Sequence, residues 1–277
     1  MSDDAAREVR TGWRAVWHDP AATRFLLSQG AGQAADALTA LVLARVVLTG
    51  DDGGVNPDAL LATLAVAIVP YAVVGPIAGV VADRWSRRRA LGLMHLVRAL
   101  LTFGAIWAVV VAHRPTGLVV AATLLAAARL VYAIRAAALP CIAPSGHLVR
   151  TDSCSLYVGM VAAVTGGVLG GLAAEHHAVG ALLLAAAAQV TAAVGFGTLG
   201  RDLGGRSTRR EVAWTCVARR IAELVTSSPT RFVIAVTTSC RALLGAAFAT
   251  FVLLASDEYG FGPDGYLFAL AVTGAGS

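Results

Sequence analysis

Charged residues are scarce in this 277-residue chain. They make up 14% of it and hydrophobic residues 57%, whereas about 25% of the residues of a soluble domain are charged. The few charges form short clusters that separate apolar stretches, and each stretch is about as long as a membrane-spanning helix. The composition therefore disfavours a soluble globular domain and is typical of a polytopic helical membrane protein.

Several signatures of other protein classes are also absent. The four cysteines have no C-x-x-C pair, so we predict no metal site, and no G-x-x-x-x-G-K-[ST] loop supports direct use of ATP. No nucleophile motif points to an enzyme, and we expect no cofactor. The net charge of +5 comes from arginines placed between apolar stretches rather than on one patch. Nucleic acid is therefore not an expected partner.

Long apolar runs, rich in Ala and Leu, predict helices rather than the short alternating strands of a membrane barrel. Seven runs are long enough to span the hydrocarbon core of a bilayer, and an eighth begins near Gly265. The predicted spans are 22–47, 59–82, 90–112, 117–139, 154–174, 178–199 and 231–255.

The arginines predict the orientation of these spans, because cytoplasmic loops carry an excess of basic residues. Fifteen of the 22 arginines lie in the N-terminal arm, at the start of the first span (Arg24) and in the loops after the second, fourth and sixth spans. The alternate loops hold only Arg114, together with acidic residues. We therefore expect the N-terminus in the cytoplasm and a location in the cytoplasmic membrane.

The longest loop divides the chain into two bundles. We expect a cytoplasmic arm (1–21), a complete six-helix bundle (22–199), a cytoplasmic linker (200–230) and the start of a second bundle (231–277). Inside the linker, Thr208 to Glu211 has the form of a capping box, and apolar residues follow it at helical spacing. This pattern predicts an amphipathic helix on the inner leaflet, with a solvated linker helix as the alternative.

The loop after the second span carries the most specific motif. It reads Gly79-Val-Val-Ala-Asp83-Arg84-Trp-Ser-Arg87-Arg88-Arg89 and resembles the signature loop of the major facilitator superfamily, although Ser86 replaces the usual second glycine. Three further stretches are similar to the drug and macrolide efflux branch of that superfamily. These are Pro70 with Gly75 and Pro76, the segment around Arg98, and Arg135 to Pro140.

Four glycines in the fifth predicted span resemble the antiporter motif of the superfamily, with Gly167 where a proline is usual. Gly166 and Gly170, like Gly167 and Gly171, form small-xxx-small pairs that favour close helix packing. The resemblance adds a gating role for these glycines. It also implies that Gly79, Asp83, Arg84, Arg87 and Arg88 form a gating latch, whereas their basic charge alone serves topology.

Asp36 is the only acid well inside a predicted span. It lies near the middle of the first span, and Gln29 and Gln33 share its helical face. Charges inside a bilayer are costly and usually face a cavity or a partner. The first span lines the central cavity in the superfamily, so Asp36 is a candidate for proton or cation coupling. A structural, hydrogen-bonding acid is the alternative.

Other polar residues inside the spans complete the candidate cavity. Arg129 lies near the centre of the fourth span, followed by Tyr132 and Arg135, and Arg241 lies in the seventh. Arg129 is expected to hold an anionic group or to influence the protonation of Asp36, whereas Arg135 is also placed to extend to the inner surface. His95 in the third span is expected to be a packing or interfacial residue.

The resemblance implies an all-α fold of inverted three-helix repeats and a secondary transporter. We expect proton-coupled efflux of a small amphipathic drug or metabolite, with protons, the substrate and the lipid bilayer as partners. The superfamily has twelve spans, whereas we predict that this chain stops within the eighth. A truncated non-transporting protein, or a half-transporter that needs a partner chain, is the alternative.

Overall fold

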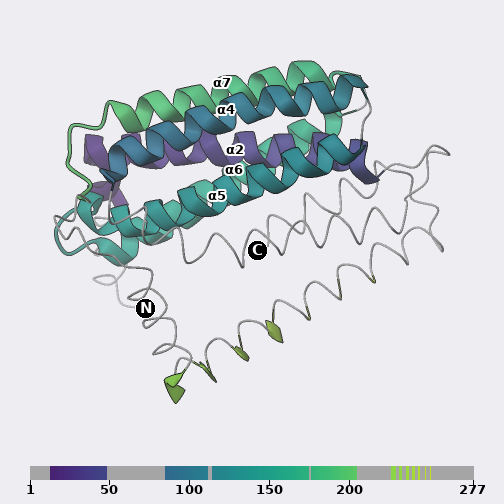
Figure 1. Cartoon of the computed structure of the whole chain (residues 1–277). Coiled ribbons are helices and arrows are strands. Elements are labelled where there is room, and N and C mark those ends of the chain that lie inside the picture. Colours follow the sequence, from purple (N-terminus) through teal and green to yellow (C-terminus); the bar gives the residue numbers. More distant parts are fainter. Residues whose placement is uncertain are drawn as a thin grey trace, which may run out of the picture.

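The fold is entirely helical in the part of the chain that the computed structural model describes. This part comprises residues 13–48, 85–111, 114–174 and 176–204, with isolated positions between 226 and 250. Its long helices lie side by side and are drawn as ribbons in Figure 1. They are α2 (Pro20–Leu48), α4 (Arg87–Val111), α5 (Arg114–Ile142), α6 (Leu148–Ala173) and α7 (Ala178–Gly197).

These five helices correspond to predicted spans one, three, four, five and six. The helices α4, α5, α6 and α7 are long and apolar enough to cross a membrane, which confirms a polytopic helical protein. Predicted span 59–82, nearly all of 231–255 and the expected linker helix lie outside the described residues. The division of the chain into two bundles therefore remains a prediction.

Several helices begin earlier than predicted. Helix α4 includes Arg87 to Arg89 in its first turn, and α6 begins at Leu148 and includes Arg150. The prediction placed these arginines in loops because it followed the apolar run, whereas a helix continues beyond the hydrocarbon into the polar interface. Helix α2 begins at Pro20, where Asp19 Oδ1 accepts the backbone N–H of Ala21 at 2.9 Å and caps the helix.

Helix α2 is the central helix of the described bundle. It packs against α6 and α7, and α4 packs against α7 and α5. Small residues make the closest approaches possible. A Cβ atom added to Gly166 or Gly170 of α6 would collide with the backbone of α2 at Ala34 or Leu38.

The surface of the bundle is apolar and its interior is partly polar. Helix α4 shows this most clearly, because its buried face carries His95, Arg98 and Thr102. Its exposed face carries large apolar side chains, namely Leu93, Leu96, Leu100, Phe103 and Trp107. A soluble protein has the opposite distribution. The surrounding medium that suits this surface is hydrocarbon.

Two apolar clusters fill the interior at different heights. One includes Phe25, Leu91 and Phe196, and the other includes Leu38, Ala105 and Leu182. The buried polar residues of α4 and α7, and Ser28 and Gln29 of α2, lie between these clusters along each helix. Arg98 is about 16 Å along α4 from its start, at 1.5 Å per residue. This places the polar layer near the middle of a hydrocarbon core about 30 Å thick.

Arginines tie the helix ends together at one end of the bundle. Arg87 donates to the carbonyl of Ala137 at 2.8 Å, and Arg88 donates to that of Leu199 at 2.8 Å. Arg201 donates to the carbonyl of Ile142 at 2.9 Å and forms an ion pair of 3.0 Å with Asp19. Ile142 is the last residue of α5, and its carbonyl has no partner within the helix, so Arg201 satisfies it.

Candidate functional site

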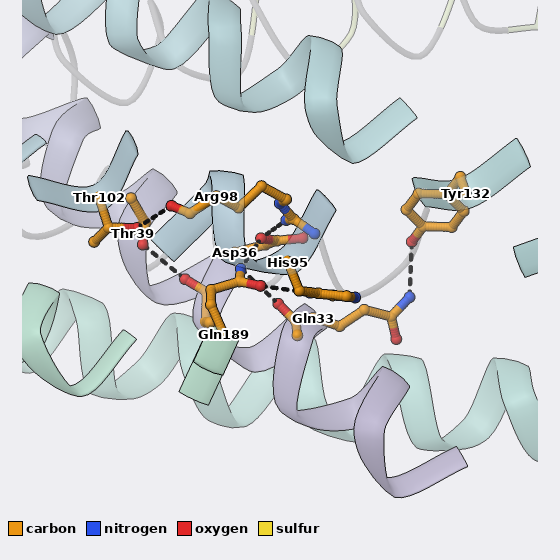
Figure 2. Close-up of polar contacts among 10 residues, drawn as sticks. Gln33, Asp36, Thr39, His95, Arg98, Thr102, Tyr132 and Gln189 are labelled. Carbon is orange, nitrogen blue, oxygen red and sulfur yellow. Dashed lines mark hydrogen bonds and ion pairs between the residues drawn. The ribbon is translucent and has the colours of Figure 1, made fainter. Parts of the chain in front are cut away.

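An ion pair between Asp36 and Arg98 is the centre of the polar layer (Figure 2). Asp36 comes from α2 and Arg98 from α4, and their side chains are 29% and 3% exposed. The cost of burying a charge is several kcal/mol per ion, and only a partner with good geometry offsets it. The pair therefore holds α2 and α4 together at mid-depth of the bundle.

Gln189 of α7 joins the ion pair to His95. Its Nε2 donates to Asp36 Oδ1 at 2.8 Å, and its Oε1 lies 2.6 Å from His95 Nδ1. A carboxylate can only accept, so the amide nitrogen must face Asp36 and the amide oxygen must face His95. His95 Nδ1 therefore carries the proton. Its Nε2 has a free lone pair and no partner among the described residues.

A second group of polar side chains extends from the ion pair along α2. Gln29 donates to the carbonyl of Ser155 at 2.8 Å and accepts the Ser155 hydroxyl at 2.7 Å. Gln33 donates to the Tyr132 hydroxyl at 2.9 Å. The polar stripe predicted for the first span thus has partners on both α6 and α5.

A small pocket lies beside these residues, between α2, α4, α5 and α7. Asp36, His95, Arg98, Tyr132 and Arg135 are among the residues that line it, and its water-accessible volume is about 20 Å³. This is enough for one water molecule. In the described part of the chain, the buried Nε–H of Arg98 has no acceptor and the Nε2 lone pair of His95 has no donor.

Of the predicted residues of the fourth span, Tyr132 and Arg135 line this pocket and Arg129 does not. The guanidinium of Arg135 is 4.4 Å from the centre of the Tyr132 ring, and that of Arg129 is 5.9 Å from it. Tyr132 is 42% exposed, so the pocket opens at this ring. Arg241 lies outside the described residues.

The signature loop is described only in part, because Gly79, Asp83 and Arg84 lie outside the described residues. Arg87 and Arg88 donate to the backbone carbonyls of Ala137 and Leu199, as described above. Of the four glycines, Gly166 and Gly170 contact the α2 backbone, Gly167 is buried, and a Cβ on Gly171 would have ordinary contact with Leu41. Close packing thus accounts for two of the four positions, and gating roles for the loop and the glycines remain predictions.

The sequence-based prediction did not identify Arg98 or Gln189 as site residues. Arg98 was noted as part of a resemblance and as a charge inside the third span, but no role was assigned to it, and Gln189 was not singled out. One signal was available for each. Arg98 shares a helical face with His95 and Thr102, and Gln189 is the one amide side chain in the otherwise apolar sixth span.

Comparisons with known proteins agree with this architecture. The chain is similar to two curated proteins, an uncharacterized MFS-type transporter of Mycobacterium tuberculosis and its counterpart in Mycobacterium bovis. Each is 33% identical over 155 residues, which are 56% of this chain and 35% of the relative. No family model matches the sequence, and no solved structure matches the fold. The distant homology supports membership of the major facilitator superfamily and a multi-pass membrane protein.

Proposed function

We propose that this chain acts in secondary active transport, as a proton-coupled exporter of a small amphipathic molecule, or as the part of one that contains the coupling site. The observation that carries the proposal is the buried Asp36–Arg98 ion pair at mid-depth of an apolar bundle. Ionisable residues inside a membrane are rare and mark ion pathways and proton relays, and a buried ion pair is weak evidence for a purely stabilising role.

The ion pair can couple proton binding to helix packing. Asp36 is the more accessible partner and lines the pocket, so a proton that enters the pocket reaches its carboxyl group. Protonation removes the negative charge that neutralises Arg98 and weakens the contact of α2 with α4. A buried guanidinium without its partner favours a different arrangement of these helices. Two arrangements that differ in proton occupancy are what alternating access requires.

The distribution of arginines supports a direction for this bundle in the membrane. The end that carries Arg87, Arg88 and Arg201 is the cytoplasmic end in our proposal, and the N-terminus is on the same side. A location in the cytoplasmic membrane follows from the same interpretation.

Efflux from energised membrane vesicles tests the proposal. Inverted vesicles that contain the chain are given a proton gradient, and transport of ethidium, Nile red and fluorescein is followed as a cationic, a neutral and an anionic amphipathic dye. We expect transport of at least one dye above that of vesicles without the chain, and an uncoupler should abolish it. Transport that persists with the uncoupler would refute proton coupling, and equal rates with and without the chain would refute export of such dyes.

A half-transporter that works with another chain is the second candidate. The Tyr132 hydroxyl accepts a hydrogen bond from Gln33 on a face where Tyr132 is 42% exposed. A polar face of this kind requires a cover in hydrocarbon. Native mass analysis of the purified chain decides between the candidates, because a strict monomer with full transport activity rules out the half-transporter.

A further inference from the structure

We infer that the pocket beside Tyr132 binds an anionic group, and that the transported molecule carries it as a carboxylate or a similar oxyanion. This inference rests on the proposed function for its biological meaning. The donors and charges around the pocket support the anion site independently of transport.

The charged residues that line the pocket include more cations than anions. Asp36, Arg98 and Arg135 line the pocket, and Asp36 is already neutralised by Arg98. Among the described residues Arg135 forms no ion pair. Asp152, exposed near the start of α6, acts on Arg135 electrostatically without pairing with it. Within the described ranges, one guanidinium of the pocket therefore has no bound counter-charge in a low-dielectric setting, where an anion is strongly favoured.

Several residues that line the pocket carry hydrogen-bond donors. The phenol oxygen of Tyr132 accepts the Gln33 amide, so its own proton is free to be donated. The Nε–H of the buried Arg98 has no acceptor within the described ranges. The guanidinium of Arg135 lies over the Tyr132 ring, and Arg98 also lines the pocket, so residues that carry donors come from two helices to the same small space. A planar guanidinium fork with added donors is the arrangement that binds carboxylates in proteins.

The size of the pocket limits the size of the group that it can bind. A volume of about 20 Å³ holds about one water-sized group, so an oxyanion would enter with an oxygen atom and the rest of the ligand would stay outside. The apolar remainder would lie at the opening beside Tyr132. A lipid phosphate has the same charge as a substrate carboxylate, and the experiment must separate the two sources.

Two probes of matched shape test the site. The full chain is purified in nanodiscs of zwitterionic phosphatidylcholine, and binding of 4-fluorobenzoate and of neutral 4-fluorobenzamide is measured by fluorine NMR at pH 7.5. We expect fluorobenzoate to bind at least about tenfold more tightly than fluorobenzamide, and Arg135→Gln to weaken its binding by roughly tenfold to a hundredfold, which is the usual range for a lost charged hydrogen bond. Arg135→Lys should give an intermediate Kd.

The control variant is Arg89→Gln. Arg89 is exposed in the first turn of α4 and does not line the pocket, so its loss should leave the Kd unchanged. If Arg135→Gln does not fold, Tyr132→Phe removes one donor but keeps the ring, and it should weaken fluorobenzoate binding several-fold. Equal binding of the two probes, or equal Kd values for Arg135→Gln and the wild type, would overturn the inference.

A lipid arm identifies the source of the anion. Replacing part of the phosphatidylcholine by phosphatidylglycerol should leave fluorobenzoate binding unchanged if the pocket serves a substrate. Displacement of fluorobenzoate by phosphatidylglycerol would overturn the substrate assignment and give the site to a lipid phosphate. Fluorobenzoate binding without transport of any dye would refute the proposed function and leave the anion site standing.

Discussion

Breaking the Asp36–Arg98 ion pair from one side at a time gives the sharpest test of its role. Asp36→Asn leaves the Arg98 guanidinium, which is 3% exposed, without its anion. Removing one partner of a buried pair costs about 3–5 kcal/mol, and the deep burial of Arg98 favours the upper half of that range. Arg98→Gln leaves Asp36, which is 29% exposed and faces the pocket, so we expect the lower half.

The two variants should also respond differently to pH. After Arg98→Gln, the lone carboxylate can be neutralised by a proton, and the folded state then binds more protons than the unfolded state. Stability therefore rises as pH falls, by at most about 1.4 kcal/mol per pH unit. Between pH 7 and pH 5 the penalty should shrink by up to about 2.7 kcal/mol. Asp36→Asn has no carboxyl group at this position, and its penalty should not follow that slope.

Reversible unfolding in mixed micelles, followed by tryptophan fluorescence, measures these penalties. The double variant Asp36→Asn/Arg98→Gln should be more stable than the sum of the single changes predicts, with a coupling of about 1–3 kcal/mol. Single penalties below about 0.5 kcal/mol, the range of ordinary surface changes, with an additive double variant, would refute the conclusion that the pair holds α2 to α4.

Three further predictions concern residues around the pair, and unfolding in mixed micelles also measures them. Gly166→Ala should destabilise the bundle by about 1–3 kcal/mol, because its Cβ would collide with the α2 backbone. The control Gly180→Ala has open space around it and should be neutral or stabilising. Equal effects of the two changes would contradict the close packing of α6 against α2. Gln189→Leu should cost about 1–3 kcal/mol, because Asp36 and His95 both lose a partner, and a neutral effect would refute the bridge. Asp19→Ala should lower the free energy of unfolding by about 1–2 kcal/mol, through loss of the α2 cap and of the ion pair with Arg201. The control Arg89→Ala, at the exposed start of α4, should change it by no more than about 0.5 kcal/mol.

Most of the helical architecture was predictable from the sequence. The predicted spans 90–112, 117–139 and 178–199 correspond to α4, α5 and α7, and their starts and ends differ by up to three residues. Long apolar runs between charged clusters carry this information locally. The largest difference is the start of α6 at Leu148, because a polar first turn gives no apolar signal.

The centre of the site was only half predictable. Asp36 stood out as an acid inside an apolar run, but its partner Arg98 is 62 residues away in the sequence. Which cation faces an acid depends on the rotation of α4 and α2 about their axes, and packing of small residues such as Gly166 sets that rotation. The sequence offered Arg129 as a candidate of equal charge. The pairing with Arg98, and the bridge through Gln189, required the tertiary structure.

The most direct test of the central claim is dye transport by the Asp36→Asn variant in vesicles with an imposed proton gradient. Wild-type vesicles should transport a dye at a rate that follows the gradient and falls to the level of vesicles without the chain when an uncoupler is added. The variant should lose this dependence on the gradient even when equal amounts of folded protein are present. Gradient-driven transport by Asp36→Asn at the wild-type rate would contradict the claim that the Asp36–Arg98 pair couples protons to transport.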